Sequence, residues 1–222
     1  MRAILLNIMP SAIWTIAFFE SVITILFLIR WHRKKQPIDL LAFLISVGLI
    51  LDAVIIGLGS WLQPEVLKSI TPVRFIAHGV LIPLLIPICG YAMNFNKTAM
   101  RVLWIITTLL MAAGLAQSLC IVLEQQKISD LIRYVASPDT PKWANVVSNL
   151  LSFGTIIPLM ITGIIVWFRQ KTPYLFLSAF FMFFFTAIGP ATGNTDLLFF
   201  ISMIGEAFMV FFLYLYAQDR RS

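Results

Sequence analysis

Charged residues are scarce in this sequence, and their scarcity excludes the common soluble classes. Asp, Glu, Lys and Arg make up 12% of the 222 residues, about half the share found in an average soluble domain. Hydrophobic residues make up 60%, and the mean hydropathy is +0.93. This composition indicates an all-α integral membrane protein with several transmembrane helices.

Residues that build metal sites, disulfide frameworks and cofactor pockets are also few. The sequence has two histidines, one of them His32 in a basic turn, which excludes a multi-histidine metal site. The two cysteines, Cys89 and Cys120, fall near opposite ends of apolar runs, so we expect no disulfide between them. No glycine-rich phosphate loop occurs, and no lysine falls inside a predicted span to hold retinal as a Schiff base. We therefore predict no metal and no cofactor.

The sequence does contain a series of long apolar runs. Seven of them approach or exceed the length of about 20 residues that a bilayer crossing requires. The first run lacks a small-residue cleavage site, so we expect it to remain as a helix. The sixth run ends at the turn-forming string GPATGN. These runs predict one domain over residues 1–222, a seven-transmembrane-helix bundle with spans at residues 8–30, 38–62, 73–94, 99–122, 144–168, 173–190 and 195–217.

Basic residues divide unequally between the two ends of these spans. Six of the 16 Lys and Arg residues fall at one end. The other ten fall at the richer end, namely Arg30, Arg33, Lys34, Lys35, Lys97, Arg101, Arg169, Lys171, Arg220 and Arg221. Short loops rich in Lys and Arg face the cytoplasm. We therefore predict a multi-pass protein of the plasma (inner) membrane, with its N-terminus outside and its C-terminus cytoplasmic. This role for the basic residues gives no reason to expect nucleic-acid binding.

The longest predicted connection, EQQKISDLIRYVASPDTPKW, lies on the outer side. Ile128, Leu131, Ile132 and Val135 recur in it at helical spacing, which favours a short amphipathic helix on the membrane interface. An ordinary polar connector fits the same stretch equally well.

Two other strings resemble each other, ILFLIRWHRKKQPIDLLAFL and IIVWFRQKTPYLFLSAF. Each runs from an apolar helix through a basic turn ending in proline to another apolar helix. They allow a weak 3+1+3 repeat of two three-helix units, although any two cytoplasmic turns share this character.

Away from the ends of the predicted spans, the acidic, basic and histidine residues that remain are Glu20, Asp52, His78 and Glu206, with Arg74 at the outer edge of the third span. Each charged side chain at mid-bilayer costs about 2.5–3.5 kcal/mol, so these groups must be paired, protonated or in contact with water. Their depths allow them to meet in the outer half of the bundle. We predict a buried ligand-binding pocket in which Arg74 and His78 supply positive charge and the three carboxyl groups supply negative charge.

Asn149 is a further candidate ligand-binding residue, because Asn145, Asn149 and Ser152 form a polar stripe on the fifth span. Small and polar stripes mark helix contacts and not lipid contacts. Two structural alternatives remain open. Buried polar pairs also join helices without any ligand, and the Arg74 side chain is long enough to reach the outer headgroups.

Burial also has a consequence for protonation. No lysine or arginine lies at the depth of Glu20 and Glu206, and desolvation disfavours a charged carboxylate. We therefore expect at least one of these two groups to be neutral at pH 7 and to take up a proton during the working cycle. His78, which titrates near neutrality, is the expected outer relay.

Three functions fit these residues. A small-molecule or proton-coupled transporter comes first, because such sites use midplane acids and proline-broken helices. The alternative is an intramembrane enzyme acting on a lipid, with Asp52 or Glu20 as acid or base, His78 as partner, and Arg74 gripping a phosphate or carboxylate. The third is a non-catalytic sensor or assembly partner. Whether the protein is an enzyme stays open at this point.

The expected partners are membrane lipids and a small-molecule or lipid ligand, and the sequence leaves the oligomeric state open. The shape of the pocket separates the first two functions. A cavity open sideways to lipid favours the enzyme, whereas a central cavity with a path to both faces favours the carrier.

Overall fold

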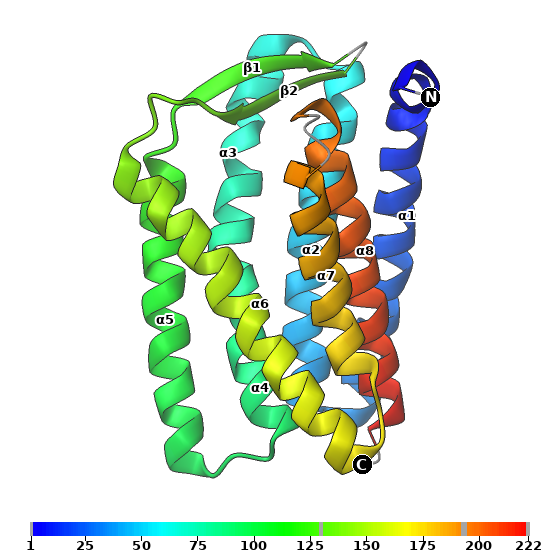
Figure 1. The fold of residues 1–222 in the computed structure, drawn as a ribbon, viewed down its shortest axis with the longest axis vertical. Coiled ribbons are helices and arrows are strands. Elements are labelled where there is room, and N and C mark those ends of the chain that lie inside the picture. The colour runs from blue at the N-terminus through cyan, green and yellow to red at the C-terminus, as the bar shows by residue number, and fades with distance from the viewer. Residues whose placement is uncertain (1, 129–130, 192–194, 221–222) are drawn as a thin grey trace.

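The computed structural model describes residues 2–128, 131–191 and 195–220. Within these ranges it contains six long apolar helices, a shorter apolar helix and one two-stranded hairpin, which confirms the all-α membrane bundle (Figure 1). Arg221 and part of the turn expected at GPATGN lie outside the described residues.

The helices are α1 (Arg2–Lys34), α2 (Pro37–Gly57), α3 (Pro64–Leu81), α4 (Leu85–Ala92), α5 (Lys97–Leu119), α6 (Lys142–Gln170), α7 (Tyr174–Ala191) and α8 (Thr195–Asp219). Two short 3₁₀ turns are η1 (Leu58–Ser60), which follows α2, and η2 (Ile82–Leu84), which joins α3 to α4 into one span. The strands are β1 (Leu123–Ile128) and β2 (Leu131–Ala136), which pair antiparallel.

The helices pack in sequence order, and α8 closes the bundle against α1. The start of α1 and the end of α8 lie at opposite ends of the bundle, and the hairpin crosses the end where α1 begins (Figure 1). We name that end the outer end and the opposite one the inner end. The side of the membrane that each end faces stays a prediction from the basic residues, and so does the 3+1+3 repeat.

The third span begins at Pro64, so the expected boundary at residue 73 is wrong. Pro64 occupies the first turn, where a missing N–H costs nothing, and Pro72 lies inside the helix. A rise of about 1.5 Å per residue places Arg74 about 15 Å and His78 about 21 Å from the helix start. Both side chains therefore lie deeper than a boundary at residue 73 implies.

A β-hairpin replaces the expected interfacial helix, which is a second correction. Ile128 and Leu131 are paired directly across the hairpin. The three-residue spacing that suggests a helix therefore arises from two strands joined by a two-residue connection. Residues such as Ile132 and Val135 are β-branched and suit strands. Burial of Leu131 and Tyr134 against the helix ends rewards this arrangement.

Contact at Gly59 sets how closely the hairpin approaches the helices. A Cβ atom at this position would lie 1.8 Å from the carbonyl oxygen of Ile132. Only a residue without a side chain allows this approach. A similar contact joins α3 to α5, because a Cβ atom on Gly114 would lie 2.1 Å from the carbonyl oxygen of Gly79.

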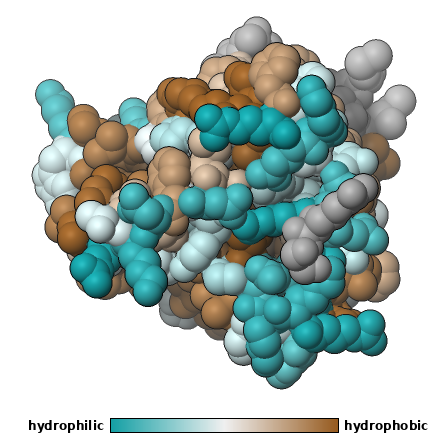
Figure 2. Space-filling view, turned by 90° about the horizontal axis from the view of Figure 1, so that it is seen from below, coloured by the Kyte–Doolittle hydropathy of each residue, from teal (hydrophilic) through white to brown (hydrophobic). Residues whose placement is uncertain are grey.

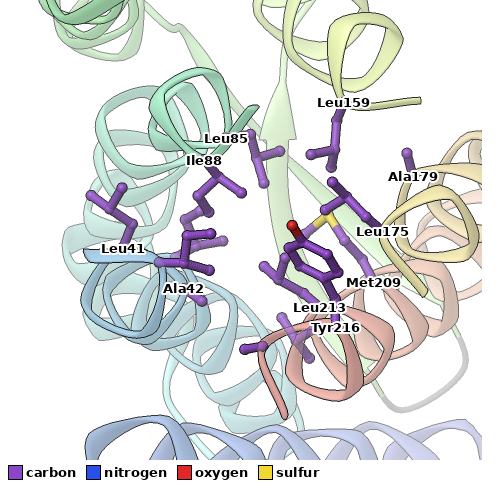
Figure 3. Close-up of a cluster of buried hydrophobic side chains, with 14 of the residues drawn as sticks. Leu41, Ala42, Leu85, Ile88, Leu159, Leu175, Ala179, Met209, Leu213 and Tyr216 are labelled. Atoms are coloured by element: carbon purple, nitrogen blue, oxygen red, sulfur yellow. The ribbon is translucent and has the colours of Figure 1, made fainter. Parts of the chain in front are cut away.

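The largest apolar cluster fills the inner half of the bundle between α2, α4, α6, α7 and α8. We call it the inner core, and Figure 3 labels its members Leu41, Ala42, Leu85, Ile88, Leu159, Leu175, Ala179, Met209, Leu213 and Tyr216. These side chains come from segments far apart in the sequence and point toward one another (Figure 3). The inner core therefore separates the polar groups above it from the inner end.

Candidate functional site

Asp52 on α2 and Arg74 on α3 form a buried ion pair. The Nε of Arg74 donates to Oδ1 of Asp52 at 2.7 Å, and the two side chains are 13% and 7% exposed. The Nη1 of Arg74 also donates to the carbonyl oxygen of Tyr134 on β2 at 3.3 Å. The predicted pairing is confirmed, and the alternative in which Arg74 reaches for outer headgroups is wrong.

His78 lies one helical turn below Arg74, between two carboxylates. Its Nδ1 is 3.8 Å from Oδ1 of Asp52, and its Nε2 is 3.6 Å from Oε1 of Glu206 on α8. Both distances exceed those of a direct hydrogen bond and fit a looser ion pair. The imidazole thus connects the Asp52–Arg74 pair to Glu206, as the predicted pocket requires.

Glu20 on α1 is the most deeply buried acid of the group, with 1% of the residue exposed. Neither of its carboxylate oxygens makes a hydrogen bond with the described residues. Glu206 and Asp52 lie near enough for their charges to act on it. Glu20 therefore joins the cluster electrostatically from behind, without forming part of the cavity wall.

A cavity of about 290 Å³ opens onto this cluster between α2, α3, α5, α6 and α8. This volume is near the lower limit for small-molecule sites. The polar side chains in its wall are Asp52, Arg74, His78, Gln117, Ser148, Ser152, Ser202 and Glu206. We call the five ionisable residues, Glu20 included, the acid–base cluster.

Asn149 lies outside this wall. It is exposed on α6, whereas Ser148 and Ser152 of the same helix line the cavity. Gln117 near the end of α5 is a polar wall residue that the sequence pattern did not single out. A single glutamine in the apolar string AAGLAQSLC is the signal that points to it.

The hairpin packs on the outer ends of the helices that hold the cavity. Its residues Ile128 and Leu131 pack with Ile13 of α1 and with Phe199 and Met203 of α8. The guanidinium of Arg133 on β2 lies 3.9 Å above the Phe199 ring and strengthens this packing. The inner core lies on the opposite side of the cavity, toward the inner end.

The exposed wall of the cavity is α6, because Ser148 and Ser152 both line it and face the surroundings. Helix α6 crosses the bundle diagonally and stands well apart from α7 at the outer end (Figure 1). The two helices meet closely in the inner half, where Gly163 lies against the Phe176 backbone. The cavity wall therefore reaches the exposed side of the bundle at Ser148 and Ser152 of α6.

No protein-family model matches the sequence, and no curated protein matches it significantly. Among the described residues, no group of His, Cys, Asp and Glu has the arrangement of a metal site. The features of the described residues that bear on function are the acid–base cluster and the shape of its cavity.

Proposed function

We propose that the protein is a membrane carrier that exchanges protons for a small amphipathic solute bearing a positive charge. One observation carries this proposal. Four ionisable groups line a cavity within the bundle, and a fifth, Glu20, is buried without a hydrogen-bond partner among the described residues.

The charges of the acid–base cluster support proton coupling. Asp52 balances Arg74, and Glu206 balances His78 when the imidazole is protonated. Glu20 remains as the fifth group, with no hydrogen-bond partner among the described residues and almost no exposure. A buried charge without a partner is costly, which favours the protonated form of Glu20. With that proton in place, the positive and negative charges of the acid–base cluster are equal.

Loss of one proton from Glu20 or His78 leaves one negative charge at the cavity. A cationic solute in the cavity compensates the same charge. The solute and the proton then compete to neutralise the same negative charge, and this competition is the basis of exchange. The apolar wall residues Ile56, Phe75 and Ile82 suit a solute with an apolar body.

The backbone below the cluster supports a conformational step. The 3₁₀ turn Ile82–Leu84 interrupts the third span one turn below His78, and Pro83 lies within it. Such interruptions often mark hinges. Movement about this turn offers a way to open the cavity toward the inner end.

An enzyme acting on a lipid is the second candidate, favoured by the cavity wall that reaches the exposed side of the bundle at α6. Asp52, His78 and Glu206 offer the acid and base that such chemistry needs. One feature weighs against the roles expected from the sequence. The Arg74 guanidinium is already engaged by Asp52 and by the Tyr134 carbonyl, so it has less capacity to grip a phosphate.

Transport by proteoliposomes tests the proposal. Vesicles that hold the full chain and an internal pH dye receive a panel of quaternary ammonium and phosphonium ions, which carry no titratable proton. We expect at least one ion to enter acid-inside vesicles and to raise the internal pH. Glu20→Gln keeps the side-chain shape and removes the carboxyl group that holds the exchanged proton in this proposal, so it should abolish this exchange.

Glu65→Gln is the matched control, because Glu65 is exposed at the start of α3 and should leave exchange unchanged. Native mass spectrometry of gently purified protein adds an independent readout of any retained molecule. Absence of exchange for every ion, together with a retained lipid that the protein converts to a product, would transfer the assignment to the enzyme.

A further inference from the structure

A second cavity, of about 690 Å³, lies at the inner end of the bundle. Figure 2 views the molecule from this end, where hydrophilic side chains gather and apolar ones flank them. The cavity wall contains four basic residues and two acidic ones, namely Arg30, Lys34, Lys171, Arg220, Asp39 and Asp219. Its excess of positive charge distinguishes it from the outer cavity, whose wall holds two acidic residues, one arginine and one histidine.

The turns of the inner end bring these residues together. Lys34 ends α1, Lys171 and Thr172 connect α6 to α7, and Arg220 follows α8. Lys171 has a φ of 60° and caps α6 in the left-handed conformation, which turns the chain back toward the bundle. The wall is therefore built from segments distant in the sequence and does not come from a single basic run.

Two of the four cations already have partners. Arg30 donates to Oδ1 of Asp39 at 3.0 Å and to the carbonyl oxygen of Ala217. Arg220 donates to the carbonyl oxygen of Tyr91 at 2.9 Å and to Oδ1 of Asn94 at 2.8 Å. Asp39 and Asp219 oppose an anion in the cavity, but the Arg30 ion pair balances the charge of Asp39, and four basic against two acidic residues leave the wall with an excess of two positive charges.

The other two cations, Lys34 and Lys171, make no hydrogen bond or short ion pair with the described residues. A second, independent observation concerns Thr172, which also lines the cavity. This residue is only 3% exposed, and its Oγ1 has no hydrogen-bond partner in the described part of the chain. A buried hydroxyl that lacks a partner at the edge of a basic cavity is a donor without an acceptor.

We propose that this inner cavity binds a phosphate group, with Lys34 and Lys171 balancing its charge and Thr172 donating a hydrogen bond. Phosphate oxygens are strong acceptors that pair with cationic side chains and hydroxyls. Helix α7 begins at Tyr174, two residues after Thr172, and the positive end of a helix dipole favours a negative charge nearby. The group comes either from an anionic lipid headgroup or from soluble phosphate, and the site does not depend on the carrier function.

Thermal unfolding of the full chain tests this site. In a neutral detergent at fixed ionic strength, potassium phosphate is compared with potassium chloride. In nanodiscs, phosphatidylcholine alone is compared with a mixture of phosphatidylcholine and phosphatidylglycerol. We expect saturable stabilisation by phosphate, by phosphatidylglycerol, or by both, relative to the paired reference.

Three variants make the test specific. Lys34→Gln/Lys171→Gln should weaken the apparent affinity about tenfold or more, since each bond to a charged group is worth at least ~1.4 kcal/mol. Thr172→Val keeps every charge and should also weaken it. The control Lys97→Gln/Arg101→Gln removes two exposed basic residues near the same end but outside the cavity, and should leave affinity unchanged.

Stabilisation by inorganic phosphate that the cavity variants weaken identifies a soluble ligand. Stabilisation by phosphatidylglycerol alone, weakened by the same variants, identifies a lipid headgroup. The proposal is overturned if neither stabilises the protein, or if the cavity and control variants lose affinity equally.

Discussion

The Arg74 guanidinium lies inside the bundle, where Asp52 balances its charge and the Tyr134 carbonyl accepts a further hydrogen bond. Such a pair need not stabilise the fold more than apolar side chains of the same shape. Removal of one member is different, because it leaves the other charged and buried. The pair is therefore a sensitive point of the molecule at the scale of single residues.

We expect Asp52→Asn to lower the free energy of unfolding by about 3–5 kcal/mol, because Arg74 loses its counter-charge inside the bundle. Unfolding in mixed detergent micelles measures the change. Asp139→Asn removes an equal charge from an exposed position and should have little effect. Asp52→Asn/Arg74→Met should recover part of the loss, and equal instability of the single and double variants would contradict the uncompensated charge.

Residue-scale prediction from sequence succeeds where burial cost leaves few options. The cost of unpaired charges in lipid, together with the similar depth of these residues in their spans, is enough to predict that Asp52, Arg74 and His78 come together. The expectation that Asn149 faces the cavity is not met, because the face that a helix presents to the cavity depends on the tilt of that helix. Helix α6 leans away from the bundle, so Ser148 and Ser152 line the cavity and Asn149 does not.

At the scale of elements, the hairpin is held against the helices by close backbone contact at Gly59. We expect Gly59→Ala to displace β2, because the new Cβ would overlap the Ile132 carbonyl oxygen. The cost is about 1–3 kcal/mol, typical of overpacking. Hydrogen exchange of residues 123–136 should accelerate.

Gly154→Ala is the matched control, because a Cβ atom there meets its nearest neighbour at an ordinary 3.7 Å. Unchanged exchange in the hairpin of the Gly59 variant would show that β2 adapts without moving. Faster exchange in both variants would point to a general effect of the substitution.

Helices are predicted well from sequence because length and apolarity decide them, and most boundaries agree within a few residues. The start of α3 is missed because Lys68 and Pro72 resemble loop residues. The hairpin is missed because a cross-strand pair such as Ile128 and Leu131 imitates helical spacing. The hairpin error arises where cross-strand contacts outweigh local pattern, whereas the α3 error overlooks a local signal, the proline in its first turn.

At the scale of the whole molecule, polarity is layered along the bundle axis. The acid–base cluster occupies the middle and outer layer, the inner core forms an apolar layer, and the basic cavity lies at the inner end. Several residues of the basic cavity are among those from which the orientation is predicted, so the layers do not test that orientation. Membrane sidedness therefore decides which compartment each cavity serves.

Cysteine labelling in intact cells tests sidedness. Cys120 is exposed at the end of α5, so a membrane-impermeant maleimide should label it from outside. In a Cys120→Ser background, Asp139→Cys should also react, whereas Lys97→Cys should react only after the cells are permeabilised. The reverse pattern would invert the topology and assign the basic cavity to the outer surface.

The slant of α6 has a consequence for the bilayer around it. Its 29 residues span about 43 Å, whereas the hydrocarbon core of a typical bilayer is about 30 Å thick. A helix this long accommodates a thin membrane by tilting and becomes more upright as the acyl chains lengthen. Because α6 forms the exposed wall of the outer cavity and is joined to α7 near Gly163, longer acyl chains should swing its outer half toward α7 and narrow the mouth. Membrane thickness would then set how readily a solute enters the outer cavity. The acyl-chain length of the surrounding lipids therefore controls the rate of solute entry.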